Sequence, residues 1–234
     1  MADRPGLVVL EQPGSVSVGE GSPWPGLGNG GLDELTLWTM QQPEIWAQLR
    51  AGRIVRAEVD RCHAAAGPEG LDARRVAAYD WIAAQLARRD PRPPGVRWPL
   101  WAWWCIGEDG PVRPDLRRYR QNGPGVMLEL RVAARRILLS DFDGWHNVLN
   151  DEFSGRGLTW YWEEKAAAVG DPARLRGLDR RKRQSWRRCL AVHPARPTQA
   201  VLWEIRPGDV RKRWEYQGVD KCDSRRKLLF EENG

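Results

Sequence analysis

The chain contains 14 tryptophans among 234 residues, an unusually high number. Each indole buries a large apolar area on entering a core, and each carries one N–H group that needs an acceptor. A chain with this many indoles requires a substantial interior, and its length suffices for one large domain with such a core. We expect most of the tryptophans in the core and a few on a wall that stacks against a ring-bearing ligand.

The remaining composition predicts a cytoplasmic protein built around one domain. Residues 1–33 are rich in Gly and Pro and are expected to form an N-terminal arm. Residues 34–220 are expected to form a single α+β domain, and 221–234 a charged tail. No stretch approaches the roughly 18 apolar residues of a membrane-spanning helix, and the apolar run near the N-terminus is too short for a secretory signal. We therefore expect no membrane contact.

Hydrophobic spacing predicts interleaved strands and helices. Residues 35–40 read as a strand, and Pro43 and Gly52 suit the start and stop of a helix. Residues 71–89 form the clearest amphipathic helix. The further expected elements are an aromatic strand within 96–106, a polar loop over 107–125, strands at 126–132 and 136–140, a helix near 143–150, mixed loop and helix over 154–185, a strand at 200–205, and a strand or helix near 210–217.

The order of these elements favours one fold class. Strands and helices alternate irregularly, and few connections have the length of a right-handed strand–helix–strand crossover. We therefore predict an α+β fold with a mixed or mainly antiparallel sheet flanked by helices.

The aromatic strand is a candidate stacking surface. In extended geometry Trp101 and Trp103 share one face, and Leu100, Ala102 and Trp104 share the other. Aromatic faces stack on bases with about 1–3 kcal/mol per base. The alternative is that both faces pack into the core.

A polar segment follows the strand at 136–140. It contains Ser140, Asp141, Asp143, His146 and Asn150. His146 could act as a general base oriented by a carboxylate. Alternatively, Asp143 is the N-cap of a helix and the cluster has no catalytic role. A metal site on Asp141, Asp143 and His146 is a weaker alternative, because their spacing matches no characteristic ligand pattern.

The net charge of +6 is concentrated in one segment. Residues 174–188 hold eight basic residues against one acidic residue, Asp179. Such a patch favours a phosphate-bearing partner such as nucleic acid, and the alternative is a solvated surface. The residues expected to contact an acidic partner are Arg180, Arg181, Lys182 and Arg183.

The cysteines offer no recognisable metal or redox motif. They lie at positions 62, 105, 189 and 222, and no two form a Cys-x-x-Cys pair. Free buried thiols are expected, and no metal cofactor is predicted. Phosphate-binding loops, nucleophile elbows and His-Glu-x-x-His motifs are absent from the sequence.

Five segments together resemble the bacterial domain-of-unknown-function family 3841. They pair tryptophans with polar residues in a fixed order, and the resemblance extends over about residues 35–215. It implies an intracellular bacterial protein and supplies no activity. The segments are LWTMQ (37–41), AYDWIAAQLARR (78–89), WPLWAW (98–103), LLSDFDGWHNVLN (138–150) and QAVLWEI (199–205).

The first strand and helix are also weakly similar to the opening of small ADP-ribosyltransferase-like domains. In that fold a His or Arg on the first strand holds NAD, and a Glu or Gln on a late strand orients the ribose. Here the first strand offers Trp38, Thr39 and Gln41, with no His or Arg, and the late candidates are Glu204 and Gln199. The fold is implied more strongly than the transferase chemistry.

These features lead to one functional hypothesis and two alternatives. We expect a nucleotide-recognising enzyme that takes NAD or a related nucleotide. Glu204 or Gln199 would orient the ribose. The alternatives are a non-enzymatic module that binds nucleic acid or another partner through residues 174–188, and a tailoring enzyme that uses the segment from Asp141 to His146. The ligand would lie against Trp38, Trp101 and Trp103, with polar contacts from Thr39, Ser140 and His146.

Overall fold

A computed structural model supplies the structure. Most of the expected arm, the expected tail, Cys62 and Cys222 lie outside the residues that it describes. The described residues are 8–11 and 15–17, for their backbone alone, and 33–58, 72–107, 112–116, 124–155, 157–193 and 196–217.

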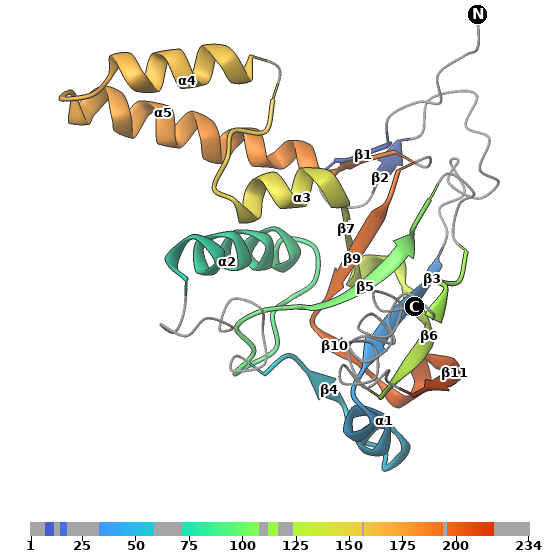
Figure 1. Ribbon diagram of the computed structural model, residues 1–234. Helices are drawn as coiled ribbons and strands as arrows, with labels where there is room; N and C mark the ends of the chain where they lie inside the picture. The colour runs from blue at the N-terminus through green and yellow to red at the C-terminus, as the bar shows by residue number, and fades with distance from the viewer. Residues whose placement is uncertain are drawn as a thin grey trace, which may run out of the picture.

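The body of the protein is a six-stranded antiparallel sheet (Figure 1). Its strand order is β11-β6-β3-β5-β9-β7, and each neighbouring pair is antiparallel. β3 and β6 are paired along eight consecutive positions, from Glu34 with Ala133 to Gln41 with Val126. The strands are β3 (Glu34–Gln41), β5 (Leu100–Cys105), β6 (Gly125–Ala133), β7 (Leu138–Asp141), β9 (Thr198–Leu202) and β11 (Val210–Tyr216).

Two smaller sheets are attached to the body. β1 (Val8–Glu11) lies between β2 (Ser15–Ser17) and β8 (Ala191–Val192). β4 (Val55–Arg56) pairs with β10 (Glu204–Ile205), so residues 148 positions apart become neighbours.

The helices begin and end where local chemistry requires. Asp72 caps α2 by accepting from the backbone N–H of Arg74 at 2.9 Å. Pro43 opens α1, and Gly52 follows its end with a positive φ of 79° that favours glycine. The helices are α1 (Pro43–Arg50), α2 (Ala73–Ala87), α3 (Phe142–Leu149), α4 (Leu158–Ala167) and α5 (Pro172–Ser185), with 3-10 turns at Ala134–Arg136, Trp186–Leu190 and Pro207–Asp209.

The two faces of the sheet pack against different cores. One face buries Leu37, Ala102 and Trp104 beside α1. The opposite face, which we call the aromatic face, packs Trp101 and Val201 against α2 and α3. Figure 1 shows α2 and α3 together on this side of the sheet. The alternation predicted for the aromatic strand is confirmed.

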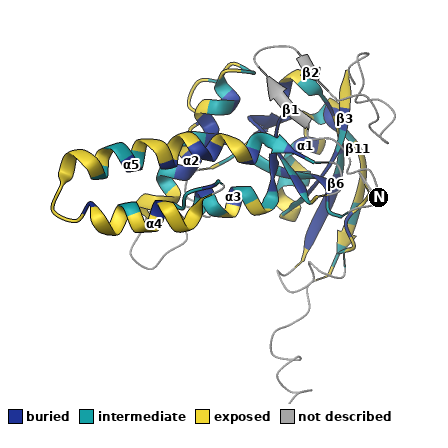
Figure 2. Ribbon diagram, turned by 90° about the horizontal axis from the view of Figure 1, so that it is seen from above, coloured by how far each residue is buried: buried dark blue, intermediate teal, exposed yellow. Residues whose placement is uncertain are grey.

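α4 and α5 form a hairpin that projects away from the sheet (Figures 1 and 2). We call this hairpin, from Leu158 to Ser185, the arm. It is a different part of the chain from the N-terminal segment, residues 1–33. Its own core is small and centres on Tyr161, Ala168 and Leu178. Figure 2 shows the arm mostly exposed, whereas the strands of the sheet are mostly buried.

The predicted α+β class and antiparallel sheet are confirmed. The segment expected at 210–217 as a strand or helix forms a strand, β11. The strand expected at 200–205 is interrupted at Trp203, which lies between the end of β9 and the start of β10. The mixed region at 154–185 contains the two helices of the arm. Among the described residues, no helix has the length and apolar character needed to cross a membrane.

Candidate functional site

The sheet opens between β3 and β5. These strands are paired at Trp38 and Trp103. Pro99 precedes β5 and has no N–H to donate, so it cannot extend the ladder. Instead, the Thr39 hydroxyl donates to the carbonyl oxygen of Trp101 at 2.9 Å and accepts from Nε2 of Gln41 at 2.7 Å. Where the two strands separate, side-chain hydrogen bonds therefore link them in place of backbone hydrogen bonds.

A pocket of about 420 Å³ lies at this opening. A volume of this size suits a small-molecule ligand. One part of its lining is apolar, and another part supplies amide, guanidinium, carboxylate and phenol groups. The lining residues are Met40, Gln41, Gln42, Ile45, Val55, Arg56, Ala57, Glu58, Tyr79, Pro99, Leu100, Trp101, Pro124 and Tyr216.

Aromatic rings form part of the pocket wall. The rings of Tyr79 and Trp101 have centroids 6.1 Å apart and meet edge to face, at 71°. Tyr216 reaches the pocket over Gly125, where a Cβ would lie 2.5 Å from Cζ of Tyr216. Glycine is therefore required at position 125 for this ring to lie where it does.

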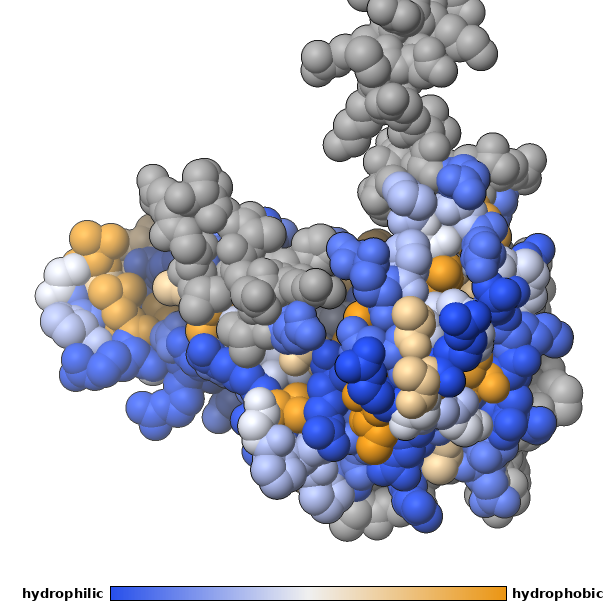
Figure 3. Space-filling view, turned by 90° about the horizontal axis from the view of Figure 1, so that it is seen from below, coloured by the Kyte–Doolittle hydropathy of each residue, from blue (hydrophilic) through white to orange (hydrophobic). Residues whose placement is uncertain are grey.

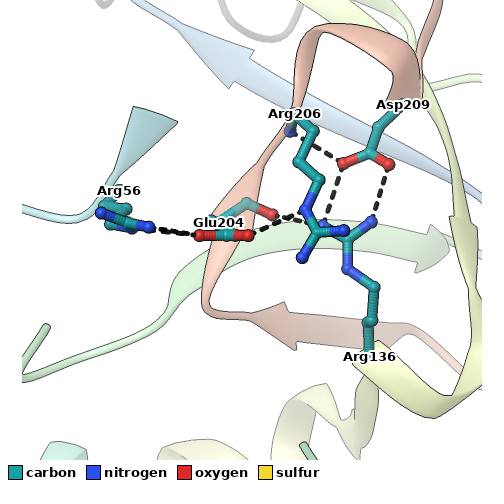
Figure 4. A network of polar contacts seen from close by, with 5 residues as sticks. All are labelled: Arg56, Arg136, Glu204, Arg206 and Asp209. Atoms are coloured by element: carbon teal, nitrogen blue, oxygen red, sulfur yellow. Dashed lines mark hydrogen bonds and ion pairs between the residues drawn. The ribbon is translucent and has the colours of Figure 1, made fainter. Parts of the chain in front are cut away.

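An ion-pair network lies behind the polar side of the pocket (Figure 4). Arg56, a pocket residue, donates from Nε and Nη2 to one oxygen of Glu204 at 3.0 and 2.9 Å. The other oxygen accepts from Nε of Arg206 at 2.8 Å. Glu204 is only 7% exposed, whereas the Arg56 side chain is 43% exposed. The buried carboxylate therefore holds a half-exposed guanidinium at the pocket.

The surroundings of Glu204 keep it ionised. Burial acts to raise the pKa of its carboxyl, but hydrogen bonds and positive charge from Arg206 and Arg56 outweigh it and lower the pKa from its ordinary value. Beside it, Arg136 makes a buried bidentate pair with Asp209 at 2.7 and 3.1 Å and donates to the Glu204 carbonyl at 3.1 Å. These contacts tie the turn after β10 to the sheet.

A second group of predicted residues forms one row across the aromatic face. Trp38 on β3 is directly opposite Trp103 on β5. Trp103 is in turn opposite Gln199 on β9, and Gln199 is opposite Ser140 on β7. Directly opposed residues in a sheet point to the same side. Trp101 lies on this face as well, two positions from Trp103. The structure therefore brings together all the predicted ligand-contacting residues of the sheet except Thr39, which alternates to the other face.

This row contains buried polar atoms without hydrogen-bond partners. Among the described residues, the buried atoms without a partner are Nε1 of Trp38, Nε1 of Trp101, Oγ of Ser140 and Oε1 of Gln199. Buried polar groups are normally satisfied, and an orphaned one costs about 1–3 kcal/mol. Other buried indoles are satisfied: Nε1 of Trp98, Trp186 and Trp203 donate to Asp80, Glu152 and Asp90 at 2.7, 2.9 and 2.8 Å.

The segment from Asp141 to His146 is organised as a helix start. Asp141, rather than the predicted Asp143, is the N-cap of α3, and it accepts from Gly144 N–H at 2.7 Å. Because the helix begins at Phe142, Asp141 and Asp143 are not in the extended geometry that would place them on one side. Nδ1 of His146 donates to the carbonyl oxygen of Phe142 at 2.8 Å. His146 is thus oriented by a carbonyl, and its exposed ring packs against Phe142, which in turn contacts Trp103.

The predicted basic contacts do not share one environment. Arg180, Arg181 and Arg183 are exposed on α5, but Lys182 is 5% exposed and pairs with Asp151 and Asp179 at 2.6 and 2.9 Å. Burial acts to lower the pKa of Lys182, yet the hydrogen bonds that it donates to both carboxylates, together with their charge, raise it above its ordinary value. Lys182 therefore anchors α5 to the body and is not available to an acidic partner.

Within the described ranges, no group of three or more His, Cys, Asp or Glu side chains is placed to hold a metal ion. Asp141, Asp143 and His146 thus form no such group. Cys105 and Cys189 are buried and are not in disulfides, and burial raises the pKa of Cys189, with nearby Asp141 adding to the effect. A thiol in this environment is a weak nucleophile.

Sequence reasoning missed several pocket residues. Arg56 and Glu58 follow no motif, and their position depends on the two-residue pairing of β4 with β10. Tyr79 lies within one of the family-like segments and in the amphipathic helix expected over residues 71–89, and its spacing alone did not distinguish it from a core residue. Tyr216 is placed by the register that pairs it with Gly125. Only the strand–proline junction at Pro99 carried a local signal for an opening.

Comparison with known proteins identifies the family. The model of the family described as a domain of unknown function, DUF3841, matches residues 36–211. The chain belongs to the DUF3841 family. No curated protein and no solved structure matches the chain. The similarity to ADP-ribosyltransferase-like domains stays a prediction.

Proposed function

We propose that this DUF3841 protein is a nucleotide-recognising enzyme and that the pocket between β3 and β5 receives the nucleotide. The ring of the ligand lies against Trp101 and Tyr79, and its phosphates meet Arg56. NAD is the candidate ligand that best combines these needs, because it has two rings linked by a pyrophosphate.

The observation that carries the proposal is the unsatisfied N–H of Trp101. This group is buried, has no acceptor among the described residues, and belongs to a side chain that lines the pocket. Native proteins rarely leave such a donor unpaired unless a ligand or water completes it. A base or carboxamide oxygen in the pocket is a suitable acceptor.

Arg56 supports the anionic part of the proposal. Its guanidinium uses Nε and Nη2 toward Glu204, which fixes its orientation at the pocket. A guanidinium is suited to phosphate because it offers several donors in a planar fork. In this arrangement Glu204 is a positioning residue that acts through Arg56.

The reaction that follows from NAD is ADP-ribosyl transfer. The bond between the ribose and the nicotinamide nitrogen breaks, its electron pair leaves with nicotinamide, and an acceptor nucleophile or water attacks the ribose carbon. The positive charge that develops on the ribose requires a nearby carboxylate or amide oxygen. Among the described lining residues, Gln41, Gln42 and Glu58 carry such oxygens.

Thermal unfolding with NAD, ADP-ribose, ATP and nicotinamide tests the proposal. A ligand that binds only the folded protein stabilises it by about 2.7 kcal/mol at a hundredfold excess over its dissociation constant. We expect NAD and ADP-ribose to raise the Tm and nicotinamide alone to raise it less. Release of nicotinamide from NAD, followed by chromatography, separates recognition from catalysis.

Two variants make the test specific. Arg56→Gln is expected to abolish the Tm shift with ADP-ribose while leaving Trp101 and Tyr79 in place. Arg53→Gln is the matched control, because Arg53 is exposed nearby and does not line the pocket. Equal shifts in the wild type and in Arg56→Gln would contradict the assignment of the phosphate position.

A further inference from the structure

The arm and the 3-10 turn that continues α5, Trp186–Leu190, concentrate positive charge away from the pocket. Residues 157–190, which include both, contain nine basic and four acidic residues, a net charge of +5 of the total +6. Figure 3 shows hydrophobic and hydrophilic residues side by side on the arm, which projects to the left of the view. The charge lies on a projecting element with little core of its own.

Four exposed arginines follow one another at regular spacing through α5 and the 3-10 turn after it. The first three are separated by four and three residues, which is the spacing of a single α-helical face, and the fourth follows four residues later in the 3-10 turn. The α-helical part of this line, from Arg176 to Arg183, is about 10 Å long at 1.5 Å per residue. All four are exposed, and the opposite side of the helix carries the buried Leu178, Lys182 and Ser185. We call these residues the arginine stripe: Arg176, Arg180, Arg183 and Arg187.

Most of the stripe is not neutralised within the protein. Arg183 pairs with Asp179 at 3.0 Å. In the described part of the chain, Arg176, Arg180 and Arg187 have no ion pair with a carboxylate. This differs from Arg174, which pairs with Glu164 at 2.6 Å, and from Lys182, which is buried between two aspartates. Unpaired charges at this spacing suit a chain of phosphates.

Exposed indoles accompany the charges. Trp160 and Trp162 on α4 are 40% and 47% exposed, although the protein buries other tryptophans completely. Arg181 lies 5.5 Å from the Trp160 ring centroid, and Lys165 lies 4.8 Å from that of Trp162. An indole face beside a cation is the arrangement that stacks on an unpaired base next to its phosphate.

We infer that the arm binds single-stranded nucleic acid, with phosphates along the arginine stripe and bases on Trp160 and Trp162. Single strands fit better than duplexes because only unpaired bases offer their faces to indoles. This inference does not depend on the nucleotide pocket.

Fluorescence anisotropy with a labelled 20-nucleotide oligouridine RNA tests this inference on the whole protein. Each neutralised phosphate on a single strand contributes about −0.7 to the slope of log Kobs against log salt. We expect the triple variant R176Q/R180Q/R187Q to bind at least tenfold more weakly and to lose about 2 from that slope. Trp160→Ala should weaken binding by about 5- to 150-fold, the range measured for base stacking.

Controls separate this result from general charge effects. R50Q/R53Q/R74Q removes the same charge from exposed positions outside the arm and should leave RNA binding within twofold of wild type. Trp101→Phe should also leave it unchanged, which distinguishes the arm from the pocket. Circular dichroism confirms that the variants are folded. Three results would overturn the inference. The protein would bind single-stranded RNA and a duplex of the same length with equal affinity, it would bind phosphatidylserine vesicles but no RNA, or the two triple variants would lose affinity for RNA equally.

Discussion

The sheet body and the arm differ in whether their polar groups are buried and paired or exposed to solvent. In the body, the charges around Glu204 are joined in short pairs, and the most buried of these is Arg136 with Asp209 at 2.7 Å, with side chains 9% and 10% exposed. The polar atoms left without partners there are uncharged. In the arm and the 3-10 turn after it, the arginine stripe and two indoles face solvent.

This difference separates two kinds of recognition. Orphaned donors and acceptors inside a sheet favour a small ligand that reaches them and excludes water. Exposed arginines beside indoles favour a long, flexible polyanion that is bound from solvent. The same residue types therefore have different predicted roles, according to whether their surroundings have already paired them.

The largest effect on the free energy of unfolding is expected from removing one member of a buried ion pair in the body. Arg136→Ala removes the charged partner of Asp209, which then keeps the backbone N–H of Arg206, and removes a donor to the Glu204 carbonyl. Removing one member of a buried pair costs about 3–5 kcal/mol. Urea unfolding should show this loss in the free energy of unfolding. A loss below about 1 kcal/mol, typical of surface pairs, would mean that the body does not depend on such pairs.

Tryptophan substitutions sharpen the contrast within the body. Trp186→Phe and Trp38→Phe remove the same atoms from buried positions, but only Trp186 donates to a carbonyl, that of Glu152. We expect Trp186→Phe to cost about 1–3 kcal/mol more than Trp38→Phe, because it leaves an acceptor unpaired. Chemical denaturation measures both, and Trp203→Phe should behave like Trp186→Phe. Equal costs for all three would show that the Trp38 N–H is satisfied.

A smaller effect is expected in acid. The folded pKa of Glu204 lies below its ordinary value of 4.5, so the unfolded chain binds its proton first as pH falls. The stability that Glu204 contributes is therefore complete above pH 4.5 and declines as pH falls through the folded pKa. Urea midpoints between pH 3 and pH 6 should fall more steeply for wild type than for Glu204→Gln. Parallel profiles would mean that Glu204 does not contribute to the loss of stability in acid.

The smallest effect is expected from an ion pair in the arm. Arg183 and Asp179 are four residues apart on α5, with side chains 53% and 46% exposed. Exposed pairs at this spacing contribute about 0.3–0.5 kcal/mol. Arg183→Gln should therefore barely change the free energy of unfolding measured in urea. A loss as large as that of Arg136→Ala would erase the distinction between body and arm.

Local patterns predicted much of the fold. Pro43 and Gly52 predicted the start and end of the first helix through their own chemistry, and the alternation around Trp101 predicted its sheet face. The two helices of the arm were harder to predict, because α5 is dominated by charged side chains with few apolar positions. The pairing of β4 with β10 has only two residues on each strand and depends entirely on tertiary contacts.

The candidate site was predicted in part. Trp38, Trp103, Gln199 and Ser140 were selected for their residue types, and the sheet register brings them into one row. Register is a long-range property, so their alignment could not be derived from local spacing. The pairing of Glu204 with Arg56 could not be derived for the same reason, and it changes the predicted role of Glu204.

Calorimetric titration of ADP-ribose into wild type, Trp101→Phe and Trp186→Phe most directly tests the claim that the unpaired groups of the body serve a nucleotide. We predict binding to the wild type and to Trp186→Phe with similar affinity. Trp101→Phe should bind about tenfold more weakly, since a hydrogen bond to the ligand is worth about 1 kcal/mol or more. Unchanged affinity in Trp101→Phe, or no binding of ADP-ribose to the folded wild type, would contradict the account.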